Sequence, residues 1–299
     1  MKFLFILSSK AGRGKSLLFE EFINKFFVEE KKNNDVYILK TKNSEDAKKY
    51  SRKFAVKYQN EGIIYVCGGD GTANEVANQL IYTDCAMGIL PFGTGNDFCK
   101  TIYGKKLKLE QIVNNIKKPL IKKIDMLKFN NIYAINAVSF GLDSVILDKA
   151  LKILAKFNKF GSKAYYIAIL MSLLKLNSYK IKFFYDGKEN EEEVLLVAIC
   201  NGKYYGNGFM PCPDASIDDG YLDVCIIKKI NLIKLLKYIL KYKKGLHIFL
   251  DDVIMLKTKH IKFISKFKII GNYDGFLCNE KEYCFELIEK KLNYAFLNY

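Results

Sequence analysis

Hydrophobic residues in the first third of the chain alternate between two spacings. Short apolar runs, typical of buried strands, are separated by segments whose apolar residues recur every three or four positions, as in amphipathic helices. The pattern predicts strands at residues 2–8, 35–40, 62–67 and 86–90, and helices at residues 15–27, 45–57 and 71–80. Such alternation is typical of a parallel sheet covered by helices. We therefore expect an α/β domain over residues 1–120.

The pattern changes near Pro119, and strands dominate the rest of the chain. They are expected at residues 121–129, 133–138, 179–185, 193–200, 221–228, 252–258, 260–267 and 282–288. Hairpin signals lie in "FNNIY" and "YDGKEN", and helices are expected at residues 142–176 and 232–242. We expect a β-rich sandwich domain over residues 121–288 with inserted helices, and a tail, 289–299, with the option of returning to the first domain. A hinge near residues 120–124 would leave a ligand cleft between the domains.

The charge balance narrows the partners only slightly. Lys and Arg number 48 against 32 Asp and Glu, a net charge of +16. Such a surplus attracts nucleic acid, anionic lipid headgroups or polyphosphate substrates, although lysines also raise solubility without any partner. No nucleic-acid-binding module is recognisable, so we expect no nucleic-acid partner.

Cysteine usage and hydropathy favour a cytoplasmic protein. Most of the eight cysteines lie in apolar runs, none forms Cys-x-x-Cys, and only two histidines occur. Buried reduced thiols explain this pattern better than disulfides or a zinc site. The first apolar run lacks a small-residue cleavage site and is expected to be a strand, not a signal peptide. The longest nearly uncharged segment, 164–174, is too short for the roughly 20 residues of a membrane span.

The sequence Gly68-Gly69-Asp70-Gly71-Thr72 lies between a predicted strand and a predicted helix. Glycines let the backbone approach phosphate oxygens, and the N–H groups at a helix N-terminus bind anions. Thr72 can cap the helix or contact phosphate. Asp70 cannot face phosphate without a cation, which suggests Mg²⁺ or a hydroxyl partner. The alternative is a glycine-rich turn with a helix cap.

A second sequence, "ILPFGTGNDFCK", repeats this arrangement, with Asn96-Asp97 opening a helix. Two phosphate-suited turns at neighbouring strand ends predict one shared site. A third loop, "SSKAGRGKS", offers Gly12 and Gly14, but Ser9 stands where a Walker A motif has its first glycine.

These two signatures resemble those of the diacylglycerol kinase catalytic domain family, which includes bacterial lipid kinases, sphingosine kinases and ceramide kinases. The first signature is shared with NAD kinases and phosphofructokinases, whereas the second is more specific to lipid kinases. The resemblance covers nearly the whole chain, through "SSKAGRGKS", "TKNSEDA", "KKIDMLKFNNIYAINAVSFGLDS" and "PCPDASIDDGYLDV". It implies an NAD kinase- or phosphofructokinase-like α/β domain that binds nucleotide, followed by a sandwich domain that binds lipid.

The resemblance also implies roles for individual residues. Asp97 would be catalytic, and Asp219 would hold a structural Mg²⁺ through its carboxylate, with Ser216 and Tyr221 contributing backbone carbonyls. Mg²⁺ prefers such hard oxygen ligands, although an acidic turn between strands would also explain this segment. The residues implied to bind ATP are Thr41, Gly69, Asp70, Gly71, Thr72, Ala73, Asn74, Glu75 and Thr94.

The chain departs from the family pattern near its C-terminus. The family has Asp-Gly-Glu, whose Glu is the proposed base, whereas here Asp274 and Gly275 precede Phe276. A phenylalanine cannot accept a proton. The enzyme could work more slowly, because phosphoryl transfer depends chiefly on positioning. Alternatively another carboxylate substitutes, with Asp274 closest and Glu280 or Glu282 within reach of a longer loop, or catalysis is lost.

The sequence therefore predicts an ATP- and Mg²⁺-dependent kinase of diacylglycerol or a similar lipid. A catalytically impaired nucleotide- or lipid-binding protein is the main alternative, and an NAD-kinase-like enzyme is a second. Residues 226–245 interleave apolar residues with lysines, which suits a peripheral contact with the inner face of the membrane, although an ordinary domain helix has the same pattern. The oligomeric state stays open and is compatible with a homodimer.

Overall fold

The first domain contains the parallel sheet that the hydrophobic pattern predicts. The structure is a computed structural model that describes residues 1–9, 15–33, 35–104, 115–157 and 163–297. Parallel strands lie in the order β4-β3-β1-β2. Their bounds are β1 (Lys2–Ser8), β2 (Val36–Thr41), β3 (Gly62–Gly68) and β4 (Ala86–Pro91). The glycine turns after β3 and β4 therefore lie at one edge of the sheet.

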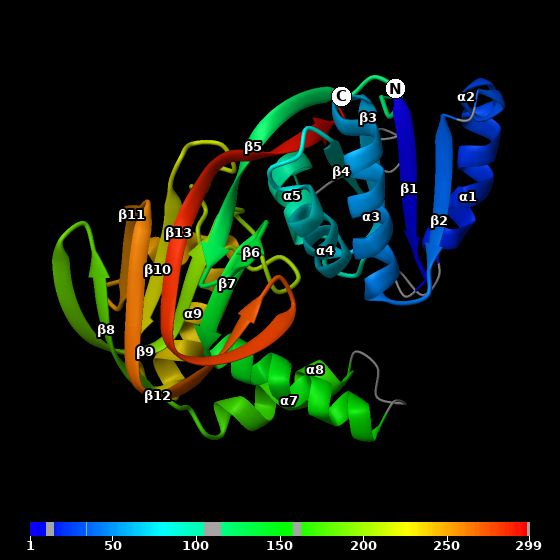
Figure 1. Ribbon diagram of the computed structural model, residues 1–299. Helices are drawn as coiled ribbons and strands as arrows, with labels where there is room; N and C mark the ends of the chain where they lie inside the picture. Colours follow the sequence, from blue (N-terminus) through cyan, green and yellow to red (C-terminus); the bar gives the residue numbers. More distant parts are fainter. Residues whose placement is uncertain (10–14, 34, 105–114, 158–162, 298–299) are drawn as a thin grey trace.

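Helices cover both faces of this sheet (Figure 1). On one face, α1 (Lys15–Phe26) packs Phe19 and Ile23 against apolar side chains of β1 and β3, and the short α2 (Val28–Lys32) follows it. On the other face lie α3 (Ser44–Tyr58), α4 (Asp70–Leu80) and α5 (Asp97–Tyr103). The 3₁₀ helix η2 (Gln59–Glu61) leads into β3. Burial of both faces explains why these strands read as continuous apolar runs.

The second domain is a sandwich with an aromatic core. Its strands are β5 (Leu120–Phe129), β6 (Ile132–Ala134), β7 (Ala137–Gly141), β8 (Tyr179–Tyr185), β9 (Lys188–Cys200), β10 (Leu222–Lys228), β11 (Val253–Thr258), β12 (His260–Tyr273) and β13 (Phe276–Phe296). Phe129, Phe140 and Tyr283 stack in the core. Tight turns at 130–131 and 186–187 join β5 to β6 and β8 to β9, which confirms both predicted hairpins.

Two predicted elements are each divided into two in the structure. The helix expected over 142–176 is two helices, α7 (Leu142–Lys156) and α8 (Lys163–Leu173). The strand expected over 133–138 is divided into β6 and β7, because the backbone N–H groups of Ile135 and Asn136 donate to the Asp274 carboxylate. The remaining helical elements are α9 (Leu232–Lys244) and the 3₁₀ helix η4 (Leu246–Phe249).

Strand β13 connects the two domains. It pairs antiparallel with β12 and β5, and then parallel with β4 through Asn293 and Tyr294. Figure 1 shows it, in red, running from the sandwich to the edge of the first sheet, beside the N-terminus. The final strand expected over 282–288 is thus much longer in the structure. In the part of the chain that the structure describes, no helix has the length and hydropathy needed to cross a membrane.

Candidate active site

The two glycine turns lie in direct contact. The N–H of Gly93 donates to the carbonyl of Gly68 at 3.0 Å. A Cβ added to Gly93 would lie only 2.4 Å from Cα of Gly69, so a side chain at this position would separate the turns. Glycine is therefore required there for close backbone approach, and the two predicted phosphate turns form one continuous surface.

Asp70 joins the first turn to the helix that follows the second. Its carboxylate accepts the backbone N–H groups of Asp97 and Phe98, both at 3.0 Å, at the start of α5. Burial, followed by the nearby Asp97 carboxylate, raises the pKa of Asp70. The sequence suggested a cation or hydroxyl partner for Asp70, whereas the structure provides helix N–H groups, which satisfy an anion equally well.

Asp97 faces both domains from the start of α5. Lys100 donates to one carboxylate oxygen of this buried residue at 2.8 Å. The backbone N–H of Asn207, in the second domain, donates to the other at 2.7 Å. The predicted catalytic carboxylate is therefore held in a defined orientation at the junction of the domains.

The residues expected to bind nucleotide divide into two groups. Partly exposed at the first turn and the start of α4 are Gly69, Asp70, Gly71, Thr72 and Glu75, and Thr94 is exposed on the second turn. Thr41 is buried at the end of β2, where its hydroxyl faces the carbonyl of Leu7 at 3.4 Å.

Thr41, Ala73 and Asn74 form the second group, because their side chains are buried. With its amide nitrogen directed at the second domain, Asn74 donates to Asp274 at 3.2 Å and to the carbonyl of Tyr133 at 3.1 Å. Asn74 thus links α4 to the second domain. The third glycine loop, with Gly12 and Gly14, lies outside the described residues.

Asp274 occupies the tip of the β12–β13 hairpin. Asp274 and Gly275 both have positive φ, of 44° and 95°, as a two-residue Asp-Gly turn requires. The Asp274 carboxylate accepts the N–H groups of Ile135 at 2.8 Å, Asn136 at 3.3 Å and Ala137 at 2.9 Å. Burial raises the pKa of Asp274 to about 7, while these donors oppose that rise. Both oxygens are engaged, so Asp274 fixes the hairpin tip to the start of β7.

Phe276 lies against the first glycine turn. A Cβ on Gly71 would be 3.7 Å from Cζ of this ring, and the ring stacks on Tyr273 with centroids 5.4 Å apart. Glu282 forms an ion pair with Lys262 at 2.6 Å, and Glu280 pairs in register with Ile269, about 13 Å along the strand from Phe276. Neither glutamate reaches back to this position, so the proposed substitution by Glu280 or Glu282 is wrong.

Comparison with known proteins identifies the family of this site. Residues 2–129 match the diacylglycerol kinase catalytic domain, and residues 136–288 match the YegS C-terminal NAD kinase beta sandwich-like domain. The chain belongs to the diacylglycerol kinase catalytic domain family. It is accordingly a lipid kinase, a phosphotransferase with an alcohol group as acceptor.

Several relatives of this lipid kinase are named diacylglycerol kinase. The diacylglycerol kinase of Bacillus subtilis is 29% identical over 71% of this chain and 70% of its own length. That of Staphylococcus carnosus is 30% identical over 71% of this chain and 69% of its own. A diacylglycerol kinase structure from Bacillus anthracis str. Sterne covers 99% of this chain and 96% of its own, with 25% identity and a TM-score of 0.72.

The segment that resembles the family's magnesium loop precedes β10. Asp219 accepts the N–H of Tyr221 at 3.1 Å and forms an ion pair with Lys257 at 2.7 Å, while the Ser216 hydroxyl donates to Asp218. One oxygen of the neighbouring Asp223 is buried and has no hydrogen-bond partner among the described residues, although Lys257 Nζ lies 3.9 Å from it. Among all the residues that the structure describes, no three or more His, Cys, Asp or Glu side chains lie close enough together to hold a metal ion. These hard oxygens fit a Mg²⁺ that takes one or two carboxylates, backbone carbonyls and water.

Asp125, which sequence reasoning did not select, holds this loop in place. It is fully buried in β5 and accepts the N–H groups of Gly220 at 2.9 Å and Lys290 at 2.8 Å. The available signal was a lone acidic residue between the apolar residues Ile124 and Met126, because a buried carboxylate needs partners.

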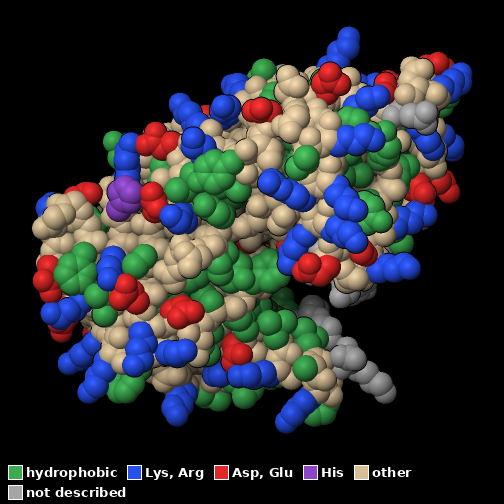
Figure 2. Space-filling view, in the orientation of Figure 1, with side chains coloured by type: hydrophobic (Ala, Val, Ile, Leu, Met, Phe, Trp, Pro, Cys, Tyr) green, Lys and Arg blue, Asp and Glu red, His purple; other side chains and the backbone are tan. Residues whose placement is uncertain are grey.

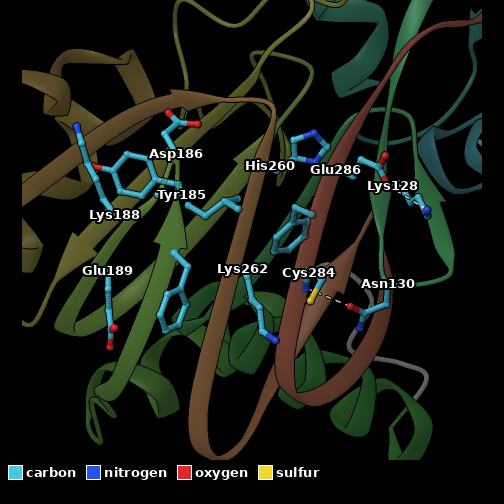
Figure 3. A pocket seen from close by; sticks show the side chains of 14 residues that line it. Lys128, Asn130, Tyr185, Asp186, Lys188, Glu189, His260, Lys262, Cys284 and Glu286 are labelled. Atoms are coloured by element: carbon cyan, nitrogen blue, oxygen red, sulfur yellow. Dashed lines mark hydrogen bonds and ion pairs between the residues drawn. The ribbon is translucent and has the colours of Figure 1, made fainter.

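A separate cavity of about 660 Å³ lies between the β8–β9 hairpin, β12 and β13. Figure 3 shows Tyr185, Asp186 and Lys188 on one side of it, and Lys128 paired with Glu286 on the other. It shares no lining residue with the glycine turns.

Proposed function

We propose that this lipid kinase transfers the γ-phosphoryl group of ATP to the hydroxyl of diacylglycerol or a similar membrane lipid. The observation that carries the proposal is the direct contact between the turns at 68–72 and 93–97. Together they offer backbone N–H groups and the N-terminus of α4 to a polyphosphate. The hairpin tip of the second domain lies against the same surface, at Gly71.

Positioning is the main contribution of this chain to the reaction. Gly69, Gly71 and Thr72 would hold the phosphates, with Thr94 contributing a hydroxyl from the second turn and Thr41 contributing one from the end of β2. Asp70 would keep the second turn fixed by binding the start of α5. Phosphoryl transfer depends largely on such positioning and on stabilisation of charge.

The proton of the lipid hydroxyl would pass to Asp97. This carboxylate lies on the nucleotide turns, and Lys100 and the N–H of Asn207 orient it. Asp274 suits a positioning role better, since its oxygens accept the backbone N–H groups of three consecutive residues, whereas Asp97 accepts only one such group within the described ranges. The ring of Phe276 lies where the family pattern has its glutamate base, so the proton transfer would proceed without that glutamate.

A bound Mg²⁺ would supply positive charge to the acidic loop before β10. The carboxylate of Asp219 and the carbonyls of Ser216 and Tyr221 would hold it. Asp125 keeps that loop against β5 by accepting the N–H of Gly220. Lys257 would compete for Asp219, because its ammonium already forms an ion pair with that carboxylate.

The lipid would approach from the side of α7 and α8, with the protein peripheral at the inner face of the membrane. Figure 2 shows hydrophobic side chains gathered over these two helices, beside the indentation between the domains. Tyr166, Leu170, Met171 and Leu174 are exposed on and just after α8. Apolar surface of this extent marks a contact site for lipid or protein.

Incubation with radiolabelled ATP and vesicles that carry one candidate lipid each tests the proposal. We expect labelled product with a diacylglycerol or a similar hydroxyl lipid, and none with Asp97→Asn. Loss of the product on chelation of Mg²⁺, with recovery on its return, would support the metal requirement.

If neither the native protein nor Phe276→Glu labels any lipid, the kinase proposal fails. In that case, measurable ATP binding would identify a nucleotide-binding protein without catalysis, the alternative that Phe276 favours. Label in NADP instead of lipid would indicate an NAD-kinase-like enzyme.

A further inference from the structure

We propose that the outer face of α9 and η4 docks on a bilayer that contains anionic lipids, and that this contact is separate from the binding of the lipid acceptor. We call this face the α9 surface. It consists of the exposed apolar residues Ile233, Leu236, Leu240, Leu246 and Phe249 and the exposed lysines Lys237, Lys241 and Lys244. The proposal rests on the proposed function only in assuming a membrane substrate.

One face of α9 holds the helix on the protein and leaves the other free. Leu235 and Tyr242 are buried in the core that α9 shares with β7, β9 and β10. Ile233, Leu236 and Leu240 lie three and four positions apart, on one outward stripe of the helix. Ile233 and Leu240 are each 68% exposed. The helix is therefore anchored, and its outward apolar stripe has no partner in the described structure.

The 3₁₀ helix η4 extends this stripe beyond the C-terminus of α9. Gly245, with φ of 75°, ends α9 in a left-handed turn and directs the chain into η4. Leu246 and Phe249 are then exposed, and Phe249 is 80% exposed. Buried His247 fixes η4 from the inside, where Nε2 lies 3.0 Å from the carbonyl of Pro211. An aromatic ring held outward on a rigid turn is well placed to enter a lipid interface.

The lysines beside the apolar stripe favour an anionic partner. Lys237, Lys241 and Lys244 flank the apolar residues, and no acidic partner for them occurs in the described part of the chain. Lys234 differs, because it pairs with Asp252 at 2.8 Å and faces away from the stripe. Each lysine near an anionic membrane surface adds electrostatic attraction to that surface. Apolar residues bordered by unpaired lysines match an anionic bilayer in both respects.

Two other occupants fit this surface less well. In a symmetric dimer built on the α9 surface, the same lysines of both copies would face one another and repel. Nucleic acid would satisfy the lysines but would leave the outward leucines and isoleucine in water. Dimer formation is an outcome of the test below.

The position of α9 makes docking useful to the kinase. Leu142 and Leu173 of α7 and α8 pack on the same cluster as Leu235 of α9, so all three helices cover one face of the second-domain sheet. A bilayer bound at the α9 surface would lie next to the apolar side chains of α8. The docking contact would thus raise the local concentration of lipid acceptor.

Vesicle co-sedimentation without ATP tests the proposal directly. Vesicles of phosphatidylcholine alone are compared with vesicles that also contain phosphatidylglycerol. We expect the native protein to bind the anionic vesicles more tightly, and the triple variant Lys237→Glu, Lys241→Glu, Lys244→Glu to lose about tenfold or more. Ile233→Ser with Leu240→Ser should weaken binding while preserving its preference for anionic vesicles.

A matched control replaces three exposed lysines of α3 in the first domain, Lys49→Glu, Lys53→Glu and Lys57→Glu. This variant has the same net charge as the α9 variant, and we expect it to bind vesicles nearly as well as the native protein. Equal loss in both variants would show that net charge alone governs binding and would overturn the proposal. The proposal would also be overturned if the native protein bound neither kind of vesicle. A concentration-dependent dimer that is lost in the variant Ile233→Ser with Leu240→Ser would overturn it too.

Phosphorylation of a short-chain lipid dispersed as monomers separates this proposal from the proposed function. If the α9 variants phosphorylate that acceptor at the native rate but fail on vesicles, the surface acts in docking. If native protein binds vesicles yet phosphorylates no acceptor, docking stands and the kinase proposal fails. If the native protein phosphorylates the dispersed acceptor but never binds vesicles, the kinase proposal stands and the docking proposal fails.

Discussion

At the scale of single residues, the most consequential feature is Phe276. Its ring contacts the turn that carries Gly71, where the family pattern has a glutamate. The backbone around it is that of an ordinary two-residue hairpin, and both Phe276 and Tyr273 are partly exposed, so a polar side chain of similar reach could be accommodated there. The substitution therefore changes the chemistry available at the site without changing its framework.

Restoring the acid at this position should increase activity. We expect Phe276→Glu to raise the rate of lipid phosphorylation by about 10²-fold, the lower range for a general base. Phe276→Gln, which has similar size but cannot accept the proton, should not show this increase. Initial rates with saturating ATP make the comparison. Equal rates for all three proteins would mean that another group, with Asp97 as the candidate, already takes the proton.

His247 makes the stability of the fold depend on pH. Burial lowers the pKa of His247 to about 4, and its Nε2 faces the carbonyl of Pro211. The unfolded chain binds a proton at this residue below about pH 6.5, whereas the folded protein does so only near pH 4. The contribution of His247 to stability is therefore lost as the pH falls from 6.5 to 4, by on the order of 1–3 kcal/mol. The raised pKa of Asp274 contributes the opposite trend over the same range, because the folded protein binds that proton at the higher pH.

Urea denaturation of the native protein and of His247→Gln at pH 7 and pH 4.5 isolates the contribution of His247. His247→Gln should be less stable at pH 7 but should lose less between the two pH values than the native protein does. His260→Gln removes the other, exposed histidine and serves as the control, with the native dependence on pH expected. An unchanged dependence in His247→Gln would contradict the assignment.

At the scale of elements, the site depends on two turns whose backbones touch. The contact between Gly93 and Gly69 leaves no room for a side chain, and Asp70 binds the N–H groups at the start of α5. The two strand–turn–helix units consequently behave as one element.

A methyl group should distinguish packing from ligand binding in these turns. Gly93→Ala places a Cβ 2.4 Å from Gly69, so we expect a loss of about 1–3 kcal/mol in unfolding free energy together with weaker nucleotide binding. Gly71→Ala meets nothing closer than 3.7 Å, so it should keep its stability and lose mainly affinity for ATP. Thermal unfolding and fluorescence titration provide the two measurements. An unaltered melting temperature in Gly93→Ala would refute the close contact.

At the scale of the whole molecule, β13 couples the domains. Leu292 and Tyr294 are fully buried in the core of the first domain, although they follow the last sandwich segment of the chain. The hydroxyl of Tyr294 accepts the N–H of Ile89 at 3.3 Å. The N-terminal domain is therefore complete only when the C-terminal strand has joined it.

This coupling predicts a large effect from a small change near the C-terminus. Leu292→Ala should lower the free energy of unfolding by about 2–5 kcal/mol, as for a fully buried leucine, and should weaken nucleotide binding more than 200 residues away in sequence. The exposed neighbour in Lys291→Ala should change stability by about 0.5 kcal/mol or less. Chemical denaturation followed by circular dichroism provides the values. A loss below about 1 kcal/mol in Leu292→Ala would show that β13 is not part of this core.

The sequence alone determined the features that depend on neighbouring residues. Apolar spacing defined the parallel sheet, and Asn-Asn and Asp-Gly pairs predicted the hairpins at 130–131 and 186–187. The same Asp-Gly signal occurs at 274–275, where it forms the turn between β12 and β13. The two glycine signatures identified the nucleotide turns because backbone approach to phosphate requires glycine locally.

Only the tertiary structure decided which distant groups meet. Asp274 accepts N–H groups from residues up to 139 positions away, and Asp125 joins Gly220 and Lys290. Neither pairing follows from local spacing, since a buried carboxylate shows only that it needs partners and not which ones. The physical reason is that local patterns depend on backbone geometry within a few residues, whereas these contacts depend on the path of the whole chain, closed by β13.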